Sequence, residues 1–486
     1  MLKTLNTGSV FHVLGFLILL IGLIQFIPLV VSFIYMDGSS SGIILSIAVS
    51  ILFGFVIIKS TKAQKELSIR DGFLVVGLGW LLMALFGSLP YFFSGSIATF
   101  TDSFFESMSG FTTTGATILT DIEIMPKALL FWRAFTHWIG GMGIIVLSLA
   151  ILPILGIGGM QLFKAEAPGP TADKLTPRIK NTAKILWLVY VGITFVEVIF
   201  LMFGGMDLFD ATCHSFATMA TGGFSTKNAS IKAFDSTYID TIITFFMFLA
   251  GVNFALHYRF LIGKFNSYFK DFEFRAYLFI ALGSTFVLTF SNYFAGVFSS
   301  VFESLRYGVF QAVSIGTTTG FGTADYETWT SLSQILIFLL MFIGGSAGST
   351  GGGMKVIRLI VVIKHGIIEL KKMLHPQAVI PLKLGKRIVP KEVTFSIIGF
   401  FLLYVSLFVF ISIFMTIIGL DFLTAIGASA SCIGNIGPGL GNVGPTDNFA
   451  FIPGIGKWVL SFTMLIGRLE IYTILVILTS GFWRHR

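Results

Sequence analysis

Apolar residues dominate this chain in runs about as long as a membrane-spanning helix, and polar residues gather in the connections between the runs. A helix needs roughly 20 mostly apolar residues to cross the hydrocarbon core of a bilayer. Ten stretches reach this length, at 10–35, 41–58, 72–93, 128–156, 184–206, 237–262, 274–296, 331–363, 393–419 and 456–481. The pattern therefore predicts an all-α polytopic membrane protein with ten transmembrane helices.

The composition supports this prediction and excludes most soluble classes. Of the 486 residues, 55% are apolar and only 12% are charged, which is about half the charged share of an ordinary soluble domain. Cys213 and Cys432 stand alone, and the seven histidines show no metal-ligand spacing. The sequence thus predicts no enzyme, no metal-ligand cluster and no covalent cofactor.

The basic residues are distributed unevenly between the two sets of connections. Most of the 32 Lys and Arg lie at the two chain ends and in alternate connections, with the largest cluster between Lys355 and Lys391. The positive-inside rule places these segments in the cytoplasm, so both termini are expected there. Topology explains the net charge of +8, so we expect the lipid bilayer as a partner and no nucleic acid.

Four of the opposite connections contain a further apolar stretch that is too short to span, followed by a segment rich in Gly and Thr. These stretches are predicted to be four re-entrant pore helices. An acidic residue lies near the expected start of each, where the positive end of the helix dipole favours it. These residues are Asp102, Asp210, Glu303 and Asp421.

The Gly- and Thr-rich segments form an internal repeat. Aligned on one glycine each, at Gly115, Gly222, Gly320 and Gly437, they recur at near-equal intervals in the same context. The predicted fold is therefore a fourfold pseudosymmetric set of helix–pore-loop–helix repeats. The expected division is an N-terminal pair of helices at 1–65 and pore repeats at 66–165, 166–270, 271–375 and 376–486.

Such loops suit a cation path. Non-helical backbone at membrane depth survives only where protein or a cavity satisfies its polar groups. Four loops around one axis supply a ring of carbonyl oxygens, which is how potassium is selected. The candidate ion-binding residues are Thr113, Thr114, Gly115, Ala220, Thr221, Gly222, Thr318, Thr319, Gly320, Asn435, Ile436 and Gly437.

The four loops resemble those of the Trk/Ktr/HKT superfamily of potassium-translocating subunits. The resemblance covers the chain from about residue 70 to the end. Thr-Thr-Gly occurs in the first and third loops, Ala-Thr-Gly-Gly-Phe-Ser in the second and Asn-Ile-Gly-Pro-Gly in the fourth. In this alignment Ala220 and Ile436 depart from the threonines of the other loops, so fourfold symmetry is only approximate.

The resemblance implies a function and partners. It implies potassium uptake across a bacterial inner membrane, with K⁺ as the transported ion, and a homodimer. It also implies a cytoplasmic TrkA-type regulatory subunit, on which any nucleotide would bind. A separate glycine-rich run at 344–353 is not a phosphate-binding loop, because it lacks the GK[ST] ending of that motif.

That glycine-rich run interrupts the eighth apolar stretch. A glycine in a helix interior costs up to about 1 kcal/mol relative to alanine, so the run is predicted to break the helix. It is either a close-packing stretch of small residues or, as the resemblance implies, a flexible gate beneath the pore loops. The candidate gate residues are Gly344, Gly345, Ser346, Gly348, Gly351, Gly352 and Gly353.

Arg468 is a basic residue inside the last apolar stretch, 31 residues after Gly437. The same offset from the other three glycines reaches Val146, Asn253 and Gly351. We therefore expect Arg468, Asn253 and the glycine-rich run to meet at one constriction. The alternative is a structural ion pair of Arg468 with Glu197 or Glu470 away from the axis.

An ion-coupled secondary transporter of another cation or a small solute is the alternative function, since such proteins also use broken helices. It predicts intramembrane carboxylates along the path, for which Glu197 and Glu470 are the main candidates. We interpret Glu106, Cys213 and His214 as packed residues of the pore helices rather than as ligands.

Overall fold

The computed structural model describes residues 5–62, 67–143, 179–385 and 387–484, and these segments are predominantly helical. The second half of the expected span 128–156, with Val146, lies outside the described residues. Three helices come first and precede the pore repeats. They are α1 (Thr7–Ile24), α2 (Phe26–Tyr35) and α3 (Ser40–Ser60).

Four short helices end where the Gly- and Thr-rich segments begin, as the sequence predicts. Each starts with a side-chain cap on Thr99, Asp207, Ser300 or Asp421, whose oxygen accepts a backbone N–H three residues later. These four helices, which we call the pore helices after that expectation, are α5 (Phe100–Phe111), α10 (Leu208–Met219), α15 (Val301–Gly316) and α19 (Phe422–Gly434).

The remaining helices surround the pore helices or connect them, and a two-residue antiparallel pair, β1 (Lys383–Leu384) and β2 (Arg387–Ile388), follows α17. In chain order they are α4 (Ile69–Phe93), α6 (Lys127–Trp138), η1 (Ile139–Gly143), α9 (Ile179–Phe203), η2 (Ser230–Phe234), α11 (Thr237–Ala250), α12 (Phe254–Leu261), α13 (Ser267–Lys270), α14 (Phe272–Phe294), η3 (Tyr326–Thr328), α16 (Ser331–Ile343), α17 (Val356–Leu374), α18 (Lys391–Ile417), α20 (Gly454–Arg468), α21 (Tyr472–Leu478) and α22 (Ser480–Trp483).

The helices that could span a membrane differ in number from the ten expected. Six described helices are long and apolar enough, or up to eight if two bent pairs each count as one span. The expected span 237–262 is α11 and α12, which meet at 102°, and 456–481 is α20 and α21, which meet at 117°. Each bend follows directly on the end of a helix, at Ala250 and at Arg468.

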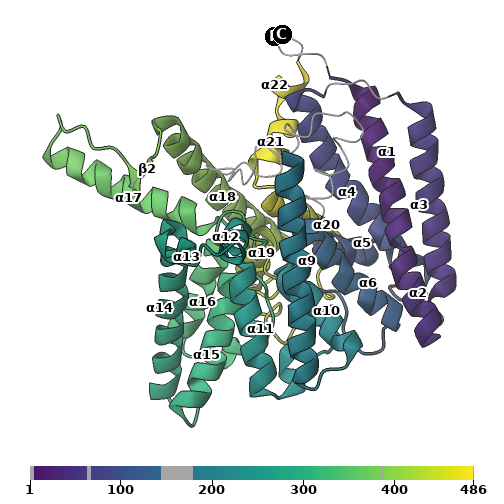
Figure 1. Ribbon diagram of the computed structural model, residues 1–486, viewed down its shortest axis with the longest axis horizontal. Coiled ribbons are helices and arrows are strands. Elements are labelled where there is room, and N and C mark those ends of the chain that lie inside the picture. Colours follow the sequence, from purple (N-terminus) through teal and green to yellow (C-terminus); the bar gives the residue numbers. More distant parts are fainter. Residues whose placement is uncertain (1–4, 63–66, 144–178, 386, 485–486) are drawn as a thin grey trace.

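The break in the eighth apolar stretch is confirmed. Helix α16 ends at Ile343, and α17 begins only at Val356 after a non-helical segment. Helix α17 projects away from the body of the molecule (Figure 1). The expected continuous span 331–363 is therefore a short helix, a loop and a helix that leaves the bundle.

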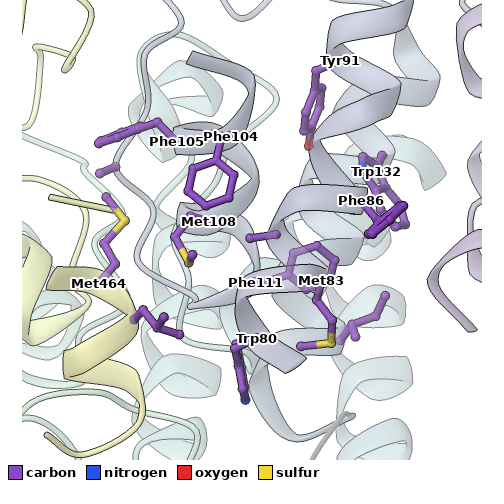
Figure 2. Close-up of a cluster of buried hydrophobic side chains, with 14 of the residues drawn as sticks. Trp80, Met83, Phe86, Tyr91, Phe104, Phe105, Met108, Phe111, Trp132 and Met464 are labelled. Carbon is purple, nitrogen blue, oxygen red and sulfur yellow. The ribbon is translucent and has the colours of Figure 1, made fainter. Parts of the chain in front are cut away.

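The largest apolar core extends from α1 and α3 to α4, α5, α6 and α20, and it includes residues on both sides of the first pore loop. Figure 2 shows its aromatic and sulfur-containing side chains packed between these helices. Phe104 stacks on Trp458 with ring centroids 4.6 Å apart, and Trp132 Nε1 donates to the Gly87 carbonyl over 2.9 Å. Burying large aromatic side chains is a main source of stability, so this core gives the first pore loop a rigid backing.

Both described ends of the chain contact the beginning of α4. The Asn6 backbone N–H donates to Asp71 Oδ1 over 2.8 Å, and the Arg70 guanidinium donates to the Arg484 carbonyl over 3.4 Å. Helices α1 and α22 accordingly reach the same end of the molecule (Figure 1).

Helices α1 and α3 approach closely because glycines face each other between them. A Cβ placed on Gly54 would lie 2.9 Å from the Gly15 carbonyl oxygen and 2.8 Å from the Leu19 nitrogen. Small residues at such positions let membrane helices pack backbone to backbone.

We expect Gly54→Val to separate α1 from α3. Overpacking costs about 1–3 kcal/mol, so the Tm of the purified protein should fall by about 2–6 °C in a thermal melt. The matched control is Gly283→Val on α14, where a Cβ would meet nothing within 4 Å. Equal melting of both variants would contradict close packing at Gly54.

Candidate functional site

The four pore helices end in the same turn. In each, a backbone N–H just past the helix donates to the carbonyl five residues earlier, so the helix end has its last carbonyls occupied. The four bonds are Thr114 to Ser109 (2.9 Å), Gly222 to Ala217 (2.8 Å), Thr319 to Ser314 (2.8 Å) and Ile436 to Ser431 (3.0 Å).

The residue before each of these donors has left-handed backbone. Its φ is +53° at Thr113, +54° at Thr221, +64° at Thr318 and +55° at Asn435. This conformation is unfavourable for β-branched residues, and such strain persists only where the surroundings impose it. The fourth loop places Asn here, a residue that tolerates left-handed backbone.

Four glycines at positive φ join the loops into a closed ring. Each lies against a carbonyl of the next loop so closely that a Cβ would overlap it or press on it. The contacts are Gly115 on the Gly222 carbonyl, Gly223 on the Thr319 carbonyl, Gly320 on the Ile436 carbonyl and Gly437 on the Thr114 carbonyl. The loops therefore follow one another around a common centre in chain order.

The second loop is shifted by one residue relative to the sequence alignment. Gly223, not Gly222, occupies the ring position of Gly115, Gly320 and Gly437. Ala220 ends α10 in right-handed backbone and lies outside the turn. The threonine of this loop, Thr221, thus matches Thr113, and the two adjacent glycines left the choice open in the sequence.

The loop side chains are buried and tied to their surroundings. Thr114 accepts a hydrogen bond from Asn435 Nδ2 over 2.9 Å, and the same amide donates to the Met464 carbonyl on α20 over 2.9 Å. Thr319 shares a hydroxyl contact of 2.7 Å with Thr317. Ile436 has no hydroxyl at the position of Thr114 and Thr319, so the side chains at this position differ between the loops.

The glycine-rich run packs against three of the four pore units. Gly352 N donates to Thr318 Oγ1 over 2.6 Å, and Gly353 N donates to the Gly434 carbonyl over 3.0 Å. Thr350 Oγ1 donates to the Met219 carbonyl over 2.9 Å. Residues 344–353, which we call the gate segment, therefore contact the ends of α10 and α19 and the third loop.

The gate segment is held from the other side by the bend between α11 and α12. Ser346 N donates to the Gly251 carbonyl over 2.8 Å, and Phe254 N donates to the Gly348 carbonyl over 3.0 Å. A Cβ on Gly348 would lie 3.0 Å from Asn253 Oδ1. The structure thus brings Asn253 and the gate segment together.

Arg468 also reaches the gate segment. Its guanidinium donates to the Thr350 carbonyl over 2.8 Å and to the Gly140 and Gly141 carbonyls over 2.8 and 3.1 Å. It lies at the end of α20, where the chain bends, and not within a continuous span. Glu470 is ion-paired with Arg358.

Three further contributors to this site were not among the candidate residues expected from the sequence. Thr350 lies inside the glycine-rich run, and Lys355 Nζ donates to the Gly351 carbonyl from just beyond it. Glu273 Oε1 accepts the Ala347 N–H over 2.7 Å from the start of α14. The polar interruption of the run by Thr350 was a usable signal, whereas Glu273 is distant in sequence and gave none.

Similarity to known proteins identifies the family of this chain. The family model described as TrkH, cation transport protein, matches residues 39–483. The chain belongs to the TrkH family. It is therefore similar over nearly its whole length to multi-pass membrane transport proteins.

The alignments with named relatives span almost the whole of this chain and almost the whole of each relative. The Trk system potassium uptake protein TrkH of Escherichia coli (strain K12) is 44% identical over 98% of this chain and 99% of its own length. The TrkH protein of Halomonas elongata is 41% identical over 99% and 100%. The crystal structure of the potassium transporter TrkH from Vibrio parahaemolyticus matches 99% of this chain and 100% of its own, with 40% identity and a TM-score of 0.89.

In this TrkH-family chain, we expect Thr350→Val to loosen the gate segment. The substitution removes the single hydroxyl proton that is shared between the Met219 and Ala250 carbonyls, a contribution of about 1.4 kcal/mol. Amide hydrogen exchange of residues 344–353, read by mass spectrometry, should become about tenfold faster. Thr241→Val, on an exposed face of α11, is the matched control, and equal exchange in both variants would show that Thr350 does not anchor the segment.

Proposed function

We propose that this protein conducts potassium ions into the cell through a selectivity filter built from the four pore loops. The closed ring of glycine–carbonyl contacts carries this proposal, because it sets four non-helical backbones around one centre. Backbone carbonyls are the ligands that replace the hydration shell of K⁺. The negative C-terminal ends of four helices converge on the same place and favour a cation.

The filter residues in this proposal follow the structural register. They are Thr113, Thr114, Gly115, Thr221, Gly222, Gly223, Thr318, Thr319, Gly320, Asn435, Ile436 and Gly437. Each of the four repeats contributes one such triplet, so the division of residues 66–486 into four pore repeats is part of the proposal.

The gate segment is proposed to open and close the path below the filter. Its hydrogen bonds to Thr318 and to the Gly434 carbonyl place it against the ring. Arg468 is proposed to hold the closed position through the Thr350 carbonyl and to repel cations there with its charge. Opening then requires these contacts to break together.

Homodimer formation and control by a TrkA-type cytoplasmic subunit are further parts of the proposal. Helix α17 carries an exposed apolar stripe at helical spacing, formed by Ile363, Ile367, Leu370 and Leu374. It leaves the bundle (Figure 1) and is joined through Lys355 and Val356 to the gate segment. A partner that binds this helix would act directly on the gate.

The orientation of the chain is proposed from charge. Asn6, Arg484 and the basic segment after α17 are assigned to the cytoplasm of a bacterial inner membrane by the positive-inside rule. The contacts of Asn6 and Arg484 with the start of α4 support a common side for both ends.

A cation-flux experiment tests the proposed filter. In liposomes, the unmodified protein should pass K⁺ in preference to Na⁺, and Gly320→Ser should erode this preference, because φ is +84° there and a side chain would overlap the Ile436 carbonyl. Gly283→Ser, in open space on α14, should behave like the unmodified protein. Absence of cation flux, or unchanged selectivity in Gly320→Ser, would refute a filter made of these loops.

The same assay tests the constriction. Arg468→Ala removes a positive charge and the hydrogen bond to the Thr350 carbonyl, so K⁺ flux should rise by about tenfold, the factor for a barrier lowered by about 1.4 kcal/mol. Flux that stays the same or falls would place Arg468 outside the ion path.

Coupled transport is the second candidate function, and Glu197 is the observation that favours it. This carboxyl group is fully buried within the apolar helix α9, a position typical of ion-coupling residues. A proton or sodium gradient should then drive K⁺ accumulation, and Glu197→Gln should abolish the driven component. Flux that follows only the K⁺ gradient would exclude this alternative.

A further inference from the structure

A buried ion pair lies behind the first two pore loops and belongs to neither the ring nor the gate segment. Arg133 on α6 donates through Nε to Glu106 Oε1 on α5 over 2.5 Å. The two side chains are 2% and 0% exposed. Two charges so completely removed from water persist only with close pairing and further hydrogen bonds.

Glu106 uses its remaining capacity to hold the chain just after the first ring glycine. Its oxygens accept hydrogen bonds from Thr117 Oγ1 over 3.0 and 3.1 Å and from Ile118 N over 3.0 Å. These residues are two and three positions past Gly115. The carboxylate therefore joins the pore helix to the segment that leaves the first loop.

Arg133 holds the corresponding segment after the second loop. Its second nitrogen donates to the Ser225 carbonyl over 2.9 Å, and its guanidinium lies 3.6 Å from the centre of the Phe224 ring. Ser225 and Phe224 are two and one positions past Gly223. Through Glu106 and the Ser225 carbonyl, this arginine thus connects the segments that leave two neighbouring loops.

The other repeats place different residues at the position of Glu106, nine residues before each ring glycine. His214 Nε2 contacts Ser225 Oγ over 2.9 Å, and Gln311 Nε2 donates to the Ala324 carbonyl over 3.4 Å. The fourth repeat has Ala428 here, and the neighbouring Gly427 packs directly on the Leu440 backbone. Of these four positions, only Glu106 carries an ion-paired carboxylate that links two repeats.

We propose that Glu106 and Arg133 are positioning residues that determine ion selectivity, because they set the spacing between the first and second pore loops. This inference rests on the proposed filter. Carbonyl ligands discriminate K⁺ from Na⁺ through their number and spacing, and the pair determines where the segments that leave two of the four loops lie. A neutral substitution of either partner leaves a buried charge unpaired, so these two segments move.

The test compares K⁺ and Na⁺ flux through the full-length protein in liposomes for Glu106→Gln, Arg133→Gln and Arg133→Lys. Each neutral variant should lower the K⁺/Na⁺ flux ratio by about tenfold. Arg133→Lys keeps a cation beside Glu106, so the protein folds, but an ammonium group lacks the planar fork that reaches Ser225 at the same time. Its ratio should fall by about threefold.

Asp102→Asn is the matched control. Asp102 lies on the same helix and is ion-paired with Lys457 over 2.5 Å, but at the helix start, away from the ring. This variant should keep the selectivity of the unmodified protein. A purely structural role of the Glu106–Arg133 pair would lower protein yield and total flux without changing the ratio.

Gly223→Ala separates failure of this inference from failure of the filter. If it lowers the flux ratio while Arg133→Lys and Glu106→Gln leave it unchanged, the filter stands and the positioning role of the pair is refuted. The same refutation follows from Arg133→Lys alone if the neutral variants do not fold. If Gly223→Ala also keeps the ratio, the loops are not a filter, and this inference falls with the proposed function.

Discussion

The need to satisfy non-helical backbone inside a largely apolar body governs this structure. Polar main-chain groups that are buried without partners cost several kilocalories per mole in such surroundings. At each pore loop, the pore-helix carbonyls receive the first N–H groups of the turn, and a glycine of the preceding loop covers a loop carbonyl. Each loop is therefore closed by its own turn and packed against its neighbours in the ring.

The backbone N–H groups of the gate segment are also satisfied, by hydrogen-bond acceptors in the ring and at the bend between α11 and α12. Its N–H groups donate to Thr318, to the Gly434 carbonyl and to the Gly251 carbonyl. The bend between α11 and α12 leaves the Gly251 carbonyl available to accept the Ser346 N–H. The segment is therefore hydrogen-bonded to the pore loops on one side and to the bend between α11 and α12 on the other.

Approximate fourfold symmetry leaves room for residues with individual roles. The backbone turn is the same in all four loops, since it depends on main-chain geometry that many sequences satisfy. The polar residues behind the loops differ, from the Glu106–Arg133 pair through His214 and Gln311 to Ala428. Main-chain geometry thus accounts for the common architecture, while side-chain chemistry distinguishes the repeats.

The sequence by itself determined the helical membrane class, the four short helices with their acidic starts, and the interruption after Ile343, because length, hydropathy and glycine density act locally. It did not determine the ring position in the second loop, because Gly222 and Gly223 are adjacent and only contact with the Thr319 carbonyl distinguishes them. The bends after Ala250 and Arg468, and the meeting of Arg133 with Glu106 and Ser225, were likewise decided by tertiary structure. They arise from contacts between residues far apart in the chain, which no local pattern encodes.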